Sequence, residues 1–491
     1  MPRGDSYPSL TGLLSASAVG VYLLVVAGAT AAVADAAQSC SNWPVCRGPV
    51  TAGDPVLLIA WGHRIAAVAV GLLVVATAAV AFADRERIER RVLAALGVAV
   101  ALFPVQVALG AVVTAGPGPV STAVHLGVGM AIFSSLALAL AWRLEPTDVD
   151  PDAVVGLQFD ASGSATPSGA AGSSGSNAPS GAAGSSGSNA PSGSPASADR
   201  PTLTRARRTL AAYVSLTKPR LMWLLCLVAA AAMALAGGSD LTVRTVVLTL
   251  GGGVLAIGAS GTFNHVLERD RDRRMNRTAD RPLATHEVPA RNALVFGFAL
   301  TAASLAVFAG VNLLAAGLGL AAIVFYSVVY TLVLKPNTVQ NTVIGGFAGA
   351  LPALIGWAAV TGQVGVPGLA LGAVIFLWTP AHFYNLALAY KEDYARGGFP
   401  MLPVVRGEAV TRKHVLLYLA ATLLAAVALS ALAGLGWLYA ATTVTFGAVF
   451  LWAVVRLHRE RDDAAAFRAF HASNAYLGAL LVAIVVDVLA L

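Results

Sequence analysis

Long apolar runs separated by short charged loops constrain the fold of this chain more than any other feature. The 491 residues are 57% hydrophobic and only 12% charged, whereas soluble domains average about 25% charged residues. A helix needs roughly 20 apolar residues to cross the hydrocarbon core of a bilayer. The sequence therefore predicts an all-α polytopic membrane protein with spans near 12–34, 56–82, 92–115, 119–142, 218–237, 241–263, 291–310, 312–334, 340–361, 366–389, 414–434, 436–456 and 470–491.

The basic residues predict the orientation of these spans. They gather in alternate loops, at 85–91, 205–220, 264–291, 391–413 and 456–461, as the positive-inside rule requires of cytoplasmic loops. We therefore expect a multi-pass protein of the cell membrane with a cytoplasmic N-terminus and the C-terminus outside. Because these loops account for the net charge of +7, that charge does not indicate a nucleic-acid partner.

Residues 145–209 interrupt the membrane pattern. This segment is rich in Gly, Ser, Ala and Pro, and SGAAGSSGSNAP occurs at 168–179 and again at 180–191. Such a composition cannot bury apolar surface and is typical of a flexible coil. We expect a plain tether between a four-helix membrane domain at 1–144 and a nine-helix domain at 210–491.

An acidic motif follows the apolar run 241–263 without a break. Asn264, Glu268 and Asp272 are spaced by four residues, so on a continuing helix they share one face. Oxygen ligands that converge at this spacing suit a hard divalent cation such as Mg²⁺, and the many arginines nearby suit a phosphorylated ligand. The motif predicts a Mg²⁺-diphosphate site at the mouth of a helical bundle.

A second acidic cluster, Glu392 and Asp393, ends the run 366–389 on the same side of the membrane. Two such clusters at helix ends can face each other across a cavity and hold two metal ions on a diphosphate. Two solvated loops that obey charge alternation are the alternative. Because Asn264 and His382 stand nearby on helices, the metal site is the preferred interpretation.

Residues 213–491 contain, in order, a series of stretches that share one family's pattern. They are LTKPR at 216–220, NHVLERDRD at 264–272, NRT at 276–278, DRPL at 280–283, NTVIGG at 341–346, LPALIGW at 351–357, WTPAHFY at 378–384, EDY at 392–394 and PMLP at 400–403. This part of the chain resembles the UbiA superfamily of intramembrane prenyltransferases. Within it, the stretches at 378–384 and 400–403 are most similar to the protohaem IX farnesyltransferase family.

The resemblance implies nine helices around a cavity that binds farnesyl diphosphate. The Mg²⁺ ligands it implies are Asn264, Glu268, Asp272 and Asp393, with Asp270 and Glu392 as further acids of the metal site; Glu268 stands where the superfamily usually has Asp. The diphosphate contacts would come from Lys218, Arg220, Arg277 and Arg281, for which positive-inside anchoring is the alternative. His265 and His382 would bind the haem substrate, and Phe263, Phe376 and Trp378 would line the farnesyl channel.

The implied reaction is transfer of a farnesyl group to a vinyl group of protohaem IX, which gives haem O. A prenyltransferase acting on a quinone or lipid acceptor is the closest rival. A transporter would show paired broken helices and inverted repeats, and a non-catalytic haem carrier would not need two acidic clusters.

Two cysteines and two histidines mark the first domain. Cys40 and Cys46 fall in the outward loop after the first run, in an oxidising compartment where their separation can close a disulfide. His63 and His125 stand near the outer ends of their helices at similar depth, so they could ligate one haem iron from two sides. The alternative is that each is an ordinary interfacial residue.

Residues 8–142 resemble one four-helix half of the haem A synthase family. The matching features are CSNWPVC at 40–46, His63-Arg64, and QVALGA at 106–111 with His125 after it. That family has a glutamate three residues before the first histidine, where this chain has Ala60. Because of this departure, a haem-binding, haem-delivering or degenerate domain is an alternative at least as well supported as one that hydroxylates haem, and two such halves could pair in a dimer. Haem A synthase and oxidase assembly proteins are the candidate protein partners.

Overall fold

Helices form all the regular structure in the described part of the chain. The computed structural model describes residues 9–34, 36, 40, 42–44, 55–116, 118–146 and 200–490. Within these ranges there is no strand, and thirteen helices are long and apolar enough to cross a membrane. This confirms the all-α, polytopic, multi-pass fold that the apolar runs predict.

The described residues of the N-terminal bundle form four long helices. Ser9 caps the first of them, since its hydroxyl accepts a hydrogen bond from the backbone N–H of Gly12, as an N-cap serine does. Each helix packs against its neighbours in the bundle. The helices are α1 (Leu10–Val33), α3 (Pro55–Ala83), α4 (Arg90–Ala115) and α5 (Pro119–Leu144), with the short η1 (Arg85–Arg87) between α3 and α4.

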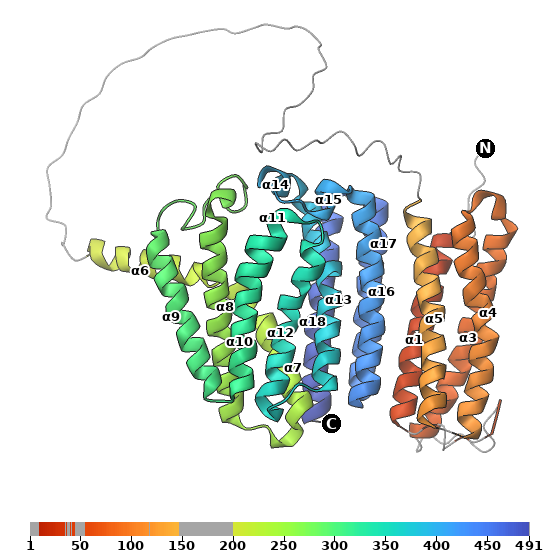
Figure 1. Cartoon of the computed structure of the whole chain (residues 1–491). Helices are drawn as coiled ribbons and strands as arrows, with labels where there is room; N and C mark the ends of the chain where they lie inside the picture. Colours follow the sequence, from red (N-terminus) through yellow and green to blue (C-terminus); the bar gives the residue numbers. More distant parts are fainter. Residues whose placement is uncertain are drawn as a thin grey trace, which may run out of the picture.

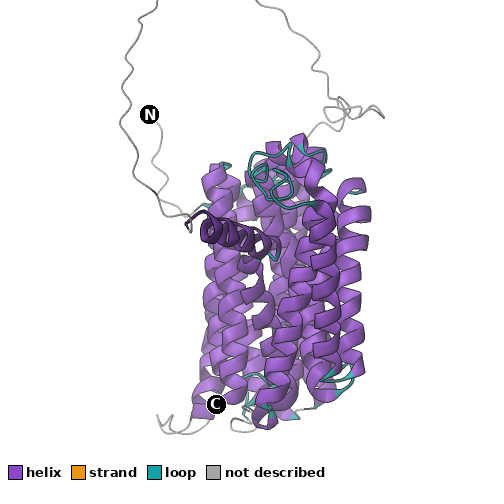
Figure 2. Ribbon diagram, turned by 90° about the vertical axis from the view of Figure 1, so that its left-hand side faces the viewer, coloured by secondary structure: helices purple, strands orange, loops and turns teal. Residues whose placement is uncertain are grey.

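A further helix, α6 (Arg200–Leu216), overlaps the C-terminal end of the linker predicted at 145–209. Residues 200–209, which we assigned to the linker, are helical, and residues 147–199, including the duplicated stretch, lie outside the described residues. Figure 2 shows that α6 lies across the membrane helices rather than along them. Its C-terminal end is anchored in the second bundle through Ala212 and Leu216, which are buried.

The C-terminal bundle holds the remaining helices. They are α7 (Pro219–Gly237), η3 (Gly238–Asp240), α8 (Val243–Asp272), α9 (Ala290–Ala309), α10 (Leu313–Val324), the π-helix η4 (Phe325–Leu334), α11 (Lys335–Asn337), α12 (Asn341–Thr361), α13 (Val366–Ala389), α14 (Lys391–Arg396), α15 (Leu402–Val405), α16 (Glu408–Ala433), α17 (Trp437–Glu460) and α18 (Asp463–Leu489).

Packing closes this bundle on itself. Consecutive long helices are neighbours, and the last, α18, packs back against α7. The tightest approach joins α7 and α12, where a Cβ added to Gly356 would lie 2.3 Å from the carbonyl oxygen of Ala229. Small residues let membrane helices approach this closely, and packing and hydrogen bonds must hold them together because lipid is as apolar as their side chains.

The two bundles share a buried interface (Figure 1). Helices α1 and α5 pack against α16 and α17, and one hydrophobic cluster contains buried residues of both bundles. Within the interface the hydroxyl of Tyr22 lies 3.3 Å from Oγ1 of Thr443. Glu145, which follows α5, accepts a hydrogen bond of 2.6 Å from Nε of Arg412 on α16. The N-terminal bundle therefore sits in a defined place beside the C-terminal one.

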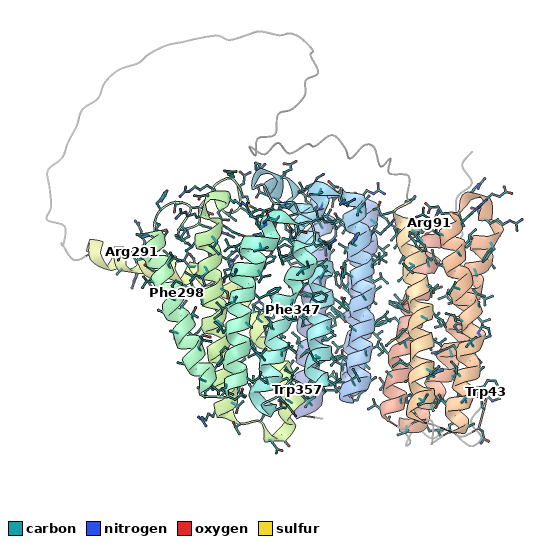
Figure 3. The ribbon with its side chains drawn as sticks, in the orientation of Figure 1. Trp43, Arg91, Arg291, Phe298, Phe347 and Trp357 are labelled. Atoms are coloured by element: carbon teal, nitrogen blue, oxygen red, sulfur yellow. The ribbon has the colours of Figure 1, made fainter. Side chains whose placement is uncertain are left out.

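Charged side chains gather at one end of the molecule. Arg91 and Arg291 lie toward the same end of the two bundles, and Trp43 and Trp357 lie toward the other (Figure 3). Helices α14 and α15 are at the arginine-rich end, whereas α18 finishes at the opposite end (Figure 1). The acidic segments thus share one end, as the loop charges predict, and which end is cytoplasmic stays a prediction.

Candidate active site

Helix α8 carries the first acidic motif on one buried face. The helix continues unbroken to Asp272, well past the apolar run that predicted it. Because residues four apart share a helix face, Asn264, Glu268 and Asp272 point the same way, and all three are buried. The spacing argument from the sequence therefore places these side chains together.

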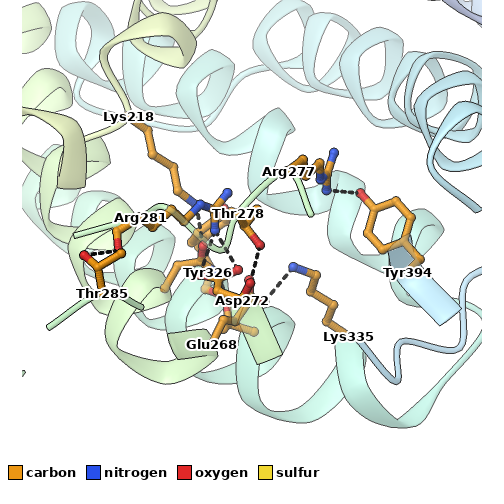
Figure 4. Close-up of polar contacts among 12 residues, drawn as sticks. Lys218, Glu268, Asp272, Arg277, Thr278, Arg281, Thr285, Tyr326, Lys335 and Tyr394 are labelled. Atoms are coloured by element: carbon orange, nitrogen blue, oxygen red, sulfur yellow. Dashed lines mark hydrogen bonds and ion pairs between the residues drawn. The ribbon is translucent and has the colours of Figure 1, made fainter. Parts of the chain in front are cut away.

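Each of these three side chains faces a cation (Figure 4). Nζ of Lys335 lies 2.6 Å from Oε1 of Glu268, and NH1 of Arg281 lies 2.9 Å from both carboxylate oxygens of Asp272. Lys218 donates to Oδ1 of Asn264. Buried carboxylates persist only when they are paired or coordinated. In this cluster the acids are paired with cations. A metal ion could bind the acids and an anion could bind the cations.

The backbone of Lys218 is strained, and this strain aims its side chain. Lys218 has a φ of 55°, a left-handed conformation that non-glycine residues rarely adopt and that often marks a functional site. Gly261 on α8 makes room for the turn, because a Cβ there would lie 2.8 Å from the carbonyl oxygen of Leu216. Nζ of Lys218 also lies 3.3 Å from the hydroxyl of Tyr326.

The π-helix η4 supplies residues that sequence reasoning did not find. It places the hydroxyl of Thr331 3.2 Å from Nδ2 of Asn264, and it places Tyr326 beside Lys218. The helix ends at Leu334, and Lys335 follows it. Wide helical turns of this kind often occur at functional sites. The only sequence signal was one lysine at the end of the apolar run 312–334, which by itself is an ordinary interfacial residue.

Asp393 fastens the loop that follows α8. Its carboxylate accepts hydrogen bonds of 3.2 Å from the backbone N–H groups of Asn276 and Arg277, and it pairs with Arg396. Burial alone would raise the pKa of Asp393, but these hydrogen bonds and the charge of Arg396 hold that pKa below its ordinary value. The carboxylate is therefore ionised at neutral pH, and it joins α14 to the loop.

Aromatic rings hold Arg277 beside this loop. NH2 of Arg277 donates a hydrogen bond of 2.7 Å to the hydroxyl of Tyr394, as Figure 4 shows. Its guanidinium lies 4.8 Å from the ring centroids of both Tyr390 and Tyr394, within the range of cation–π attraction. Its Nε is buried and has no hydrogen-bond partner among the described residues, so this cation retains capacity to bind an anion.

Three residues expected at the site are exposed and not buried with the α8 cluster. Asp270 is exposed and pairs with Arg269 and Arg273 on the outer side of α8, while Glu392 and Arg220 are exposed. Across the described ranges, no three His, Cys, Asp or Glu side chains are close enough together to hold a metal ion. The acids of α8 and of α14 are therefore not assembled here into one set of ligands.

An apolar cavity of about 100 Å³ opens beside Lys218. Its wall comes from α7, α8, α9, α10, η4 and α12, and the aromatic residues in it are Phe308 and Tyr326. The expected lining residues Phe263, Phe376 and Trp378 do not border this cavity. Lys218 supplies a charge to this wall, and through its contact with Asn264 it connects the cavity to the α8 cluster.

The two histidines expected to bind haem occupy different surroundings. His265 is buried on α8, and its Nδ1 has no hydrogen-bond partner in the described part of the chain. His382 on α13 is stacked between Trp378 and Phe470, at centroid distances of 4.2 and 4.4 Å. Its Nδ1 lies 2.6 Å from Oγ of Ser473. None of these described contacts of His382 is with the α8 cluster.

Comparison with known proteins decides the family. Residues 224–478 match the model of the UbiA prenyltransferase family, and all the buried α8 acids described above fall within that range. The chain belongs to the UbiA prenyltransferase family. This confirms the resemblance seen in the acidic motif and the stretches that follow it.

Two relatives of this family member match almost its whole length, and a third matches more than half of it. A protein named protoheme IX farnesyltransferase from Haloarcula marismortui is 60% identical over 491 residues, which cover 98% of this chain and 99% of that protein. Protoheme IX farnesyltransferase 1 from Natronomonas pharaonis is also 60% identical and covers 98% of each chain. Protoheme IX farnesyltransferase 1 from Saccharopolyspora erythraea is 49% identical over 288 residues, 58% of this chain and 92% of that protein.

A solved structure supports the fold of the second bundle. A digeranylgeranylglyceryl phosphate synthase structure superposes with a TM-score of 0.50 and 15% identity, and covers 58% of this chain and 100% of that one. At this identity the likeness concerns the fold alone.

The N-terminal bundle of this family member contains a separate group of buried polar atoms. His63 on α3 and His125 on α5 are close enough to interact electrostatically, and Nε2 of His125 lies 3.2 Å from Nε2 of Gln106. The Nδ1 atoms of both histidines and Oε1 of Gln106 are buried without hydrogen-bond partners among the described residues. Unpaired buried polar atoms are rare and call for an explanation such as a missing ligand.

The cysteine loop lies beside this group. Cys40 is disulfide-bonded, as expected, and Cys46, its expected partner, lies outside the described residues. Arg64 holds the loop, because its guanidinium donates to the carbonyl oxygens of Asn42 at 2.8 Å and Cys40 at 3.0 Å. Cys226, on α7, is a free cysteine. Residues 51–160 match a second family model, COX15-CtaA, described as a cytochrome oxidase assembly protein.

Proposed function

We propose that this chain transfers a farnesyl group from farnesyl diphosphate to a vinyl group of protohaem IX and so makes haem O. The observation that carries the proposal is the buried cluster of Asn264, Glu268 and Asp272 with its cations, one of which, Lys218, borders an apolar cavity. The relatives that are 60% identical along nearly the whole chain are named for this activity. The enzyme is thus a membrane-bound prenyltransferase.

The residues of α8 fit a magnesium ion. An amide oxygen and two carboxylates on one helix face are the hard oxygen donors that Mg²⁺ prefers, and Asn264, Glu268 and Asp272 would hold it, with Asp393 approaching from α14. When bound, Mg²⁺ would neutralise charge on the leaving diphosphate. The cations that now face these oxygens, Lys218, Lys335 and Arg281, would then bind diphosphate oxygens instead.

The transfer needs a bond to break and another to form. The bond between C1 of the farnesyl group and the diphosphate oxygen breaks, and its electron pair leaves with the diphosphate. The electrons of the haem vinyl group form the new bond to C1. The carbon left electron-poor next to the porphyrin takes up a water molecule, which loses a proton and becomes the hydroxyl group of the product.

The protein contributes electrostatics and the exclusion of water. Lys218, Lys335 and Arg281 are fixed before reaction, so they stabilise charge that develops on the diphosphate without reorganising. The apolar wall around Phe308 and Tyr326 would hold the farnesyl chain and keep stray water from the cation-like C1. Arg277, held by Tyr394, would add a further contact to the diphosphate.

Two histidines are proposed to contact haem. The ring of His382 is covered on its faces by Trp378 and Phe470 and its Nδ1 meets Ser473, so its Nε2 edge is the part that would contact haem. His265, whose Nδ1 lacks a partner in the described structure, adjoins the metal site and could accept a proton. The acidic segments are proposed to face the cytoplasm, with the end of α18 outside.

The N-terminal bundle is proposed to bind haem without hydroxylating it. His63 and His125 fit an iron from two sides, since both imidazoles have an unpaired buried Nδ1. Small residues lie beside them, because a Cβ on Gly28 would be 3.3 Å from Cε1 of His63 and one on Gly110 would be 3.4 Å from Cε1 of His125. Ala60 supplies no carboxylate for methyl-group oxidation. Haem A synthase or oxidase assembly proteins would receive the product.

Incubation of the purified protein with protohaem, farnesyl diphosphate and Mg²⁺ tests the main proposal. We expect hydroxyethylfarnesyl haem by chromatography and mass spectrometry, and its loss upon chelation or in Asp272→Ala. If the protein forms no such product while a quinone precursor becomes prenylated, the acceptor is wrong. If no acceptor is prenylated, the transferase assignment itself fails.

A further inference from the structure

A series of ion pairs connects the end of the N-terminal bundle to the active-site helix α14. Nε of Arg412 on α16 lies 2.6 Å from Oε1 of Glu145, and NH1 of the same arginine lies 3.6 Å from Oε2 of Glu408. Oε1 of Glu408 lies 3.0 Å from Nζ of Lys391, the first residue of α14. Four side chains thus span the distance from one bundle to the catalytic end of the other.

The half of this series next to the N-terminal bundle is buried, and the half next to α14 is not. The side chains of Glu145 and Arg412 are 7% and 6% exposed, whereas those of Glu408 and Lys391 are about half exposed. Arg412 pairs with both carboxylates, but its contact with Glu145 is the shorter and the more buried one, and a buried charge that loses a close partner costs more than an exposed charge that does. Glu145 therefore determines where the guanidinium of Arg412 lies, and Arg412 in turn holds Glu408.

Helix α14 transmits this position to the α8 site. Lys391 begins the helix that carries Asp393, and Asp393 holds the backbone N–H groups of Asn276 and Arg277. The same loop carries Arg281, which pairs with Asp272. A displacement of α14 would therefore move both Asp393 and the loop cations toward or away from the diphosphate position.

We propose that Glu145, in the N-terminal part of the chain, is a positioning residue for prenyl transfer in the C-terminal part. It acts through Arg412, Glu408 and Lys391 on α14, and it touches no substrate. This inference rests on the proposed function. It assigns the N-terminal bundle a second role, as a support that sets the geometry of the diphosphate site.

The test uses the full-length protein and a set of matched variants. Glu145→Gln removes the charge and keeps the shape, Lys391→Gln cuts the far end of the series, and the double variant tests whether both act on one path. Asp84→Asn is the control, because Asp84 is another carboxylate of the N-terminal bundle that pairs with an arginine, Arg87, but at an exposed site. The measurements are KM for farnesyl diphosphate, kcat, and hydrogen exchange of the backbone at 391–396.

We expect Glu145→Gln to raise KM for farnesyl diphosphate roughly threefold to tenfold, the range of couplings carried through packed networks. The kcat should change little, since binding geometry rather than the chemical groups is altered. Lys391→Gln should act similarly, the double variant should be no worse than the more affected single variant, and exchange at 391–396 should be faster in both. Asp84→Asn should match the wild type.

A wild-type KM and wild-type exchange in Glu145→Gln would overturn the inference, as would additive effects in the double variant. A lower kcat with unchanged KM would also overturn it, because that result means only that fewer molecules are folded. If Glu145→Gln does not accumulate, Glu408→Gln removes the half-exposed middle carboxylate and is judged by the same criteria. If the wild type transfers no farnesyl group, the proposed function fails. Hydrogen exchange at 391–396 then decides only whether Glu145 positions α14.

Discussion

Nζ of Lys335 lies 2.6 Å from Oε1 of Glu268, and both side chains are almost completely buried. The two residues are far apart in the sequence and belong to different helices, α11 and α8. Nζ of Lys335 also lies 4.4 Å from the ring centroid of Phe399, so the ammonium group has an aromatic surface on one side and a carboxylate on another. The pair fixes one cation at the proposed diphosphate site.

Replacing Lys335 should therefore damage catalysis. We expect Lys335→Gln to lower kcat/KM for farnesyl diphosphate by about 100-fold to 1000-fold, since removal of one preorganised donor to developing charge costs about this much. Steady-state kinetics of purified protein measure the effect. Lys413→Gln, a change of a half-buried lysine on α16, is the control and should behave as the wild type. Equal activity in the two variants would remove Lys335 from the site.

Asp272 and Asp270 offer a matched pair two residues apart on α8. Asp272 is buried and faces Arg281, whereas Asp270 is exposed and pairs with Arg269 and Arg273. Asp272→Asn should lower kcat by at least about 100-fold and weaken Mg²⁺ dependence, while Asp270→Asn should stay within about twofold of the wild type. A comparable loss in Asp270→Asn would mean that this acid turns toward the metal in the working enzyme.

The acidic motif shows how far sequence reasoning reached and where it stopped. The four-residue spacing of Asn264, Glu268 and Asp272 is a property of one helix, so it could be read without a structure. The spacing also indicates that Asp270 lies elsewhere, because a residue two positions away points to another side of a helix. The sequence prediction included Asp270 because of family resemblance rather than geometry.

Contacts between distant segments could not be predicted in the same way. Nothing in the run 312–334 indicates that ten residues form a π-helix or that Lys335 meets Glu268. Glu392 and Asp393 are adjacent in sequence, yet one is exposed and the other buried, because the partners of Asp393 are backbone N–H groups of another segment. Tertiary packing decides such details, and local sequence does not record it.

The contact between α7 and α12 should be intolerant of one added methyl group. Gly356→Ala would place a Cβ 2.3 Å from the carbonyl oxygen of Ala229 and 2.9 Å from Cβ of Ala232. Overpacking of this kind costs about 1–3 kcal/mol, so thermal unfolding in detergent should occur at a lower temperature. Gly317→Ala on α10, where a Cβ would meet nothing within 4 Å, should leave the unfolding temperature unchanged. A normal transition in Gly356→Ala would show that α7 and α12 separate easily.

The N-terminal haem site should be separable from prenyl transfer. His63→Ala and His125→Ala should each lose haem bound by the N-terminal bundle, as measured by the haem absorbance of purified protein, because an iron held from two sides loses one ligand. Farnesyl transfer should stay within about twofold of the wild type, since neither residue contacts the α8 cluster. The exposed His471 is the control. Haem retained in both variants would contradict the ligand assignment.

The buried interface between the bundles makes the peptide connection between them dispensable for their association. Tyr22 reaches Thr443, Glu145 reaches Arg412, and one apolar core contains residues of both parts. The two parts therefore relate to each other as subunits of a heterodimer that happen to be encoded together. We expect a cut between 147 and 199 to leave that heterodimer intact, in which case the covalent link would keep the two partners in equal numbers and at a high effective concentration.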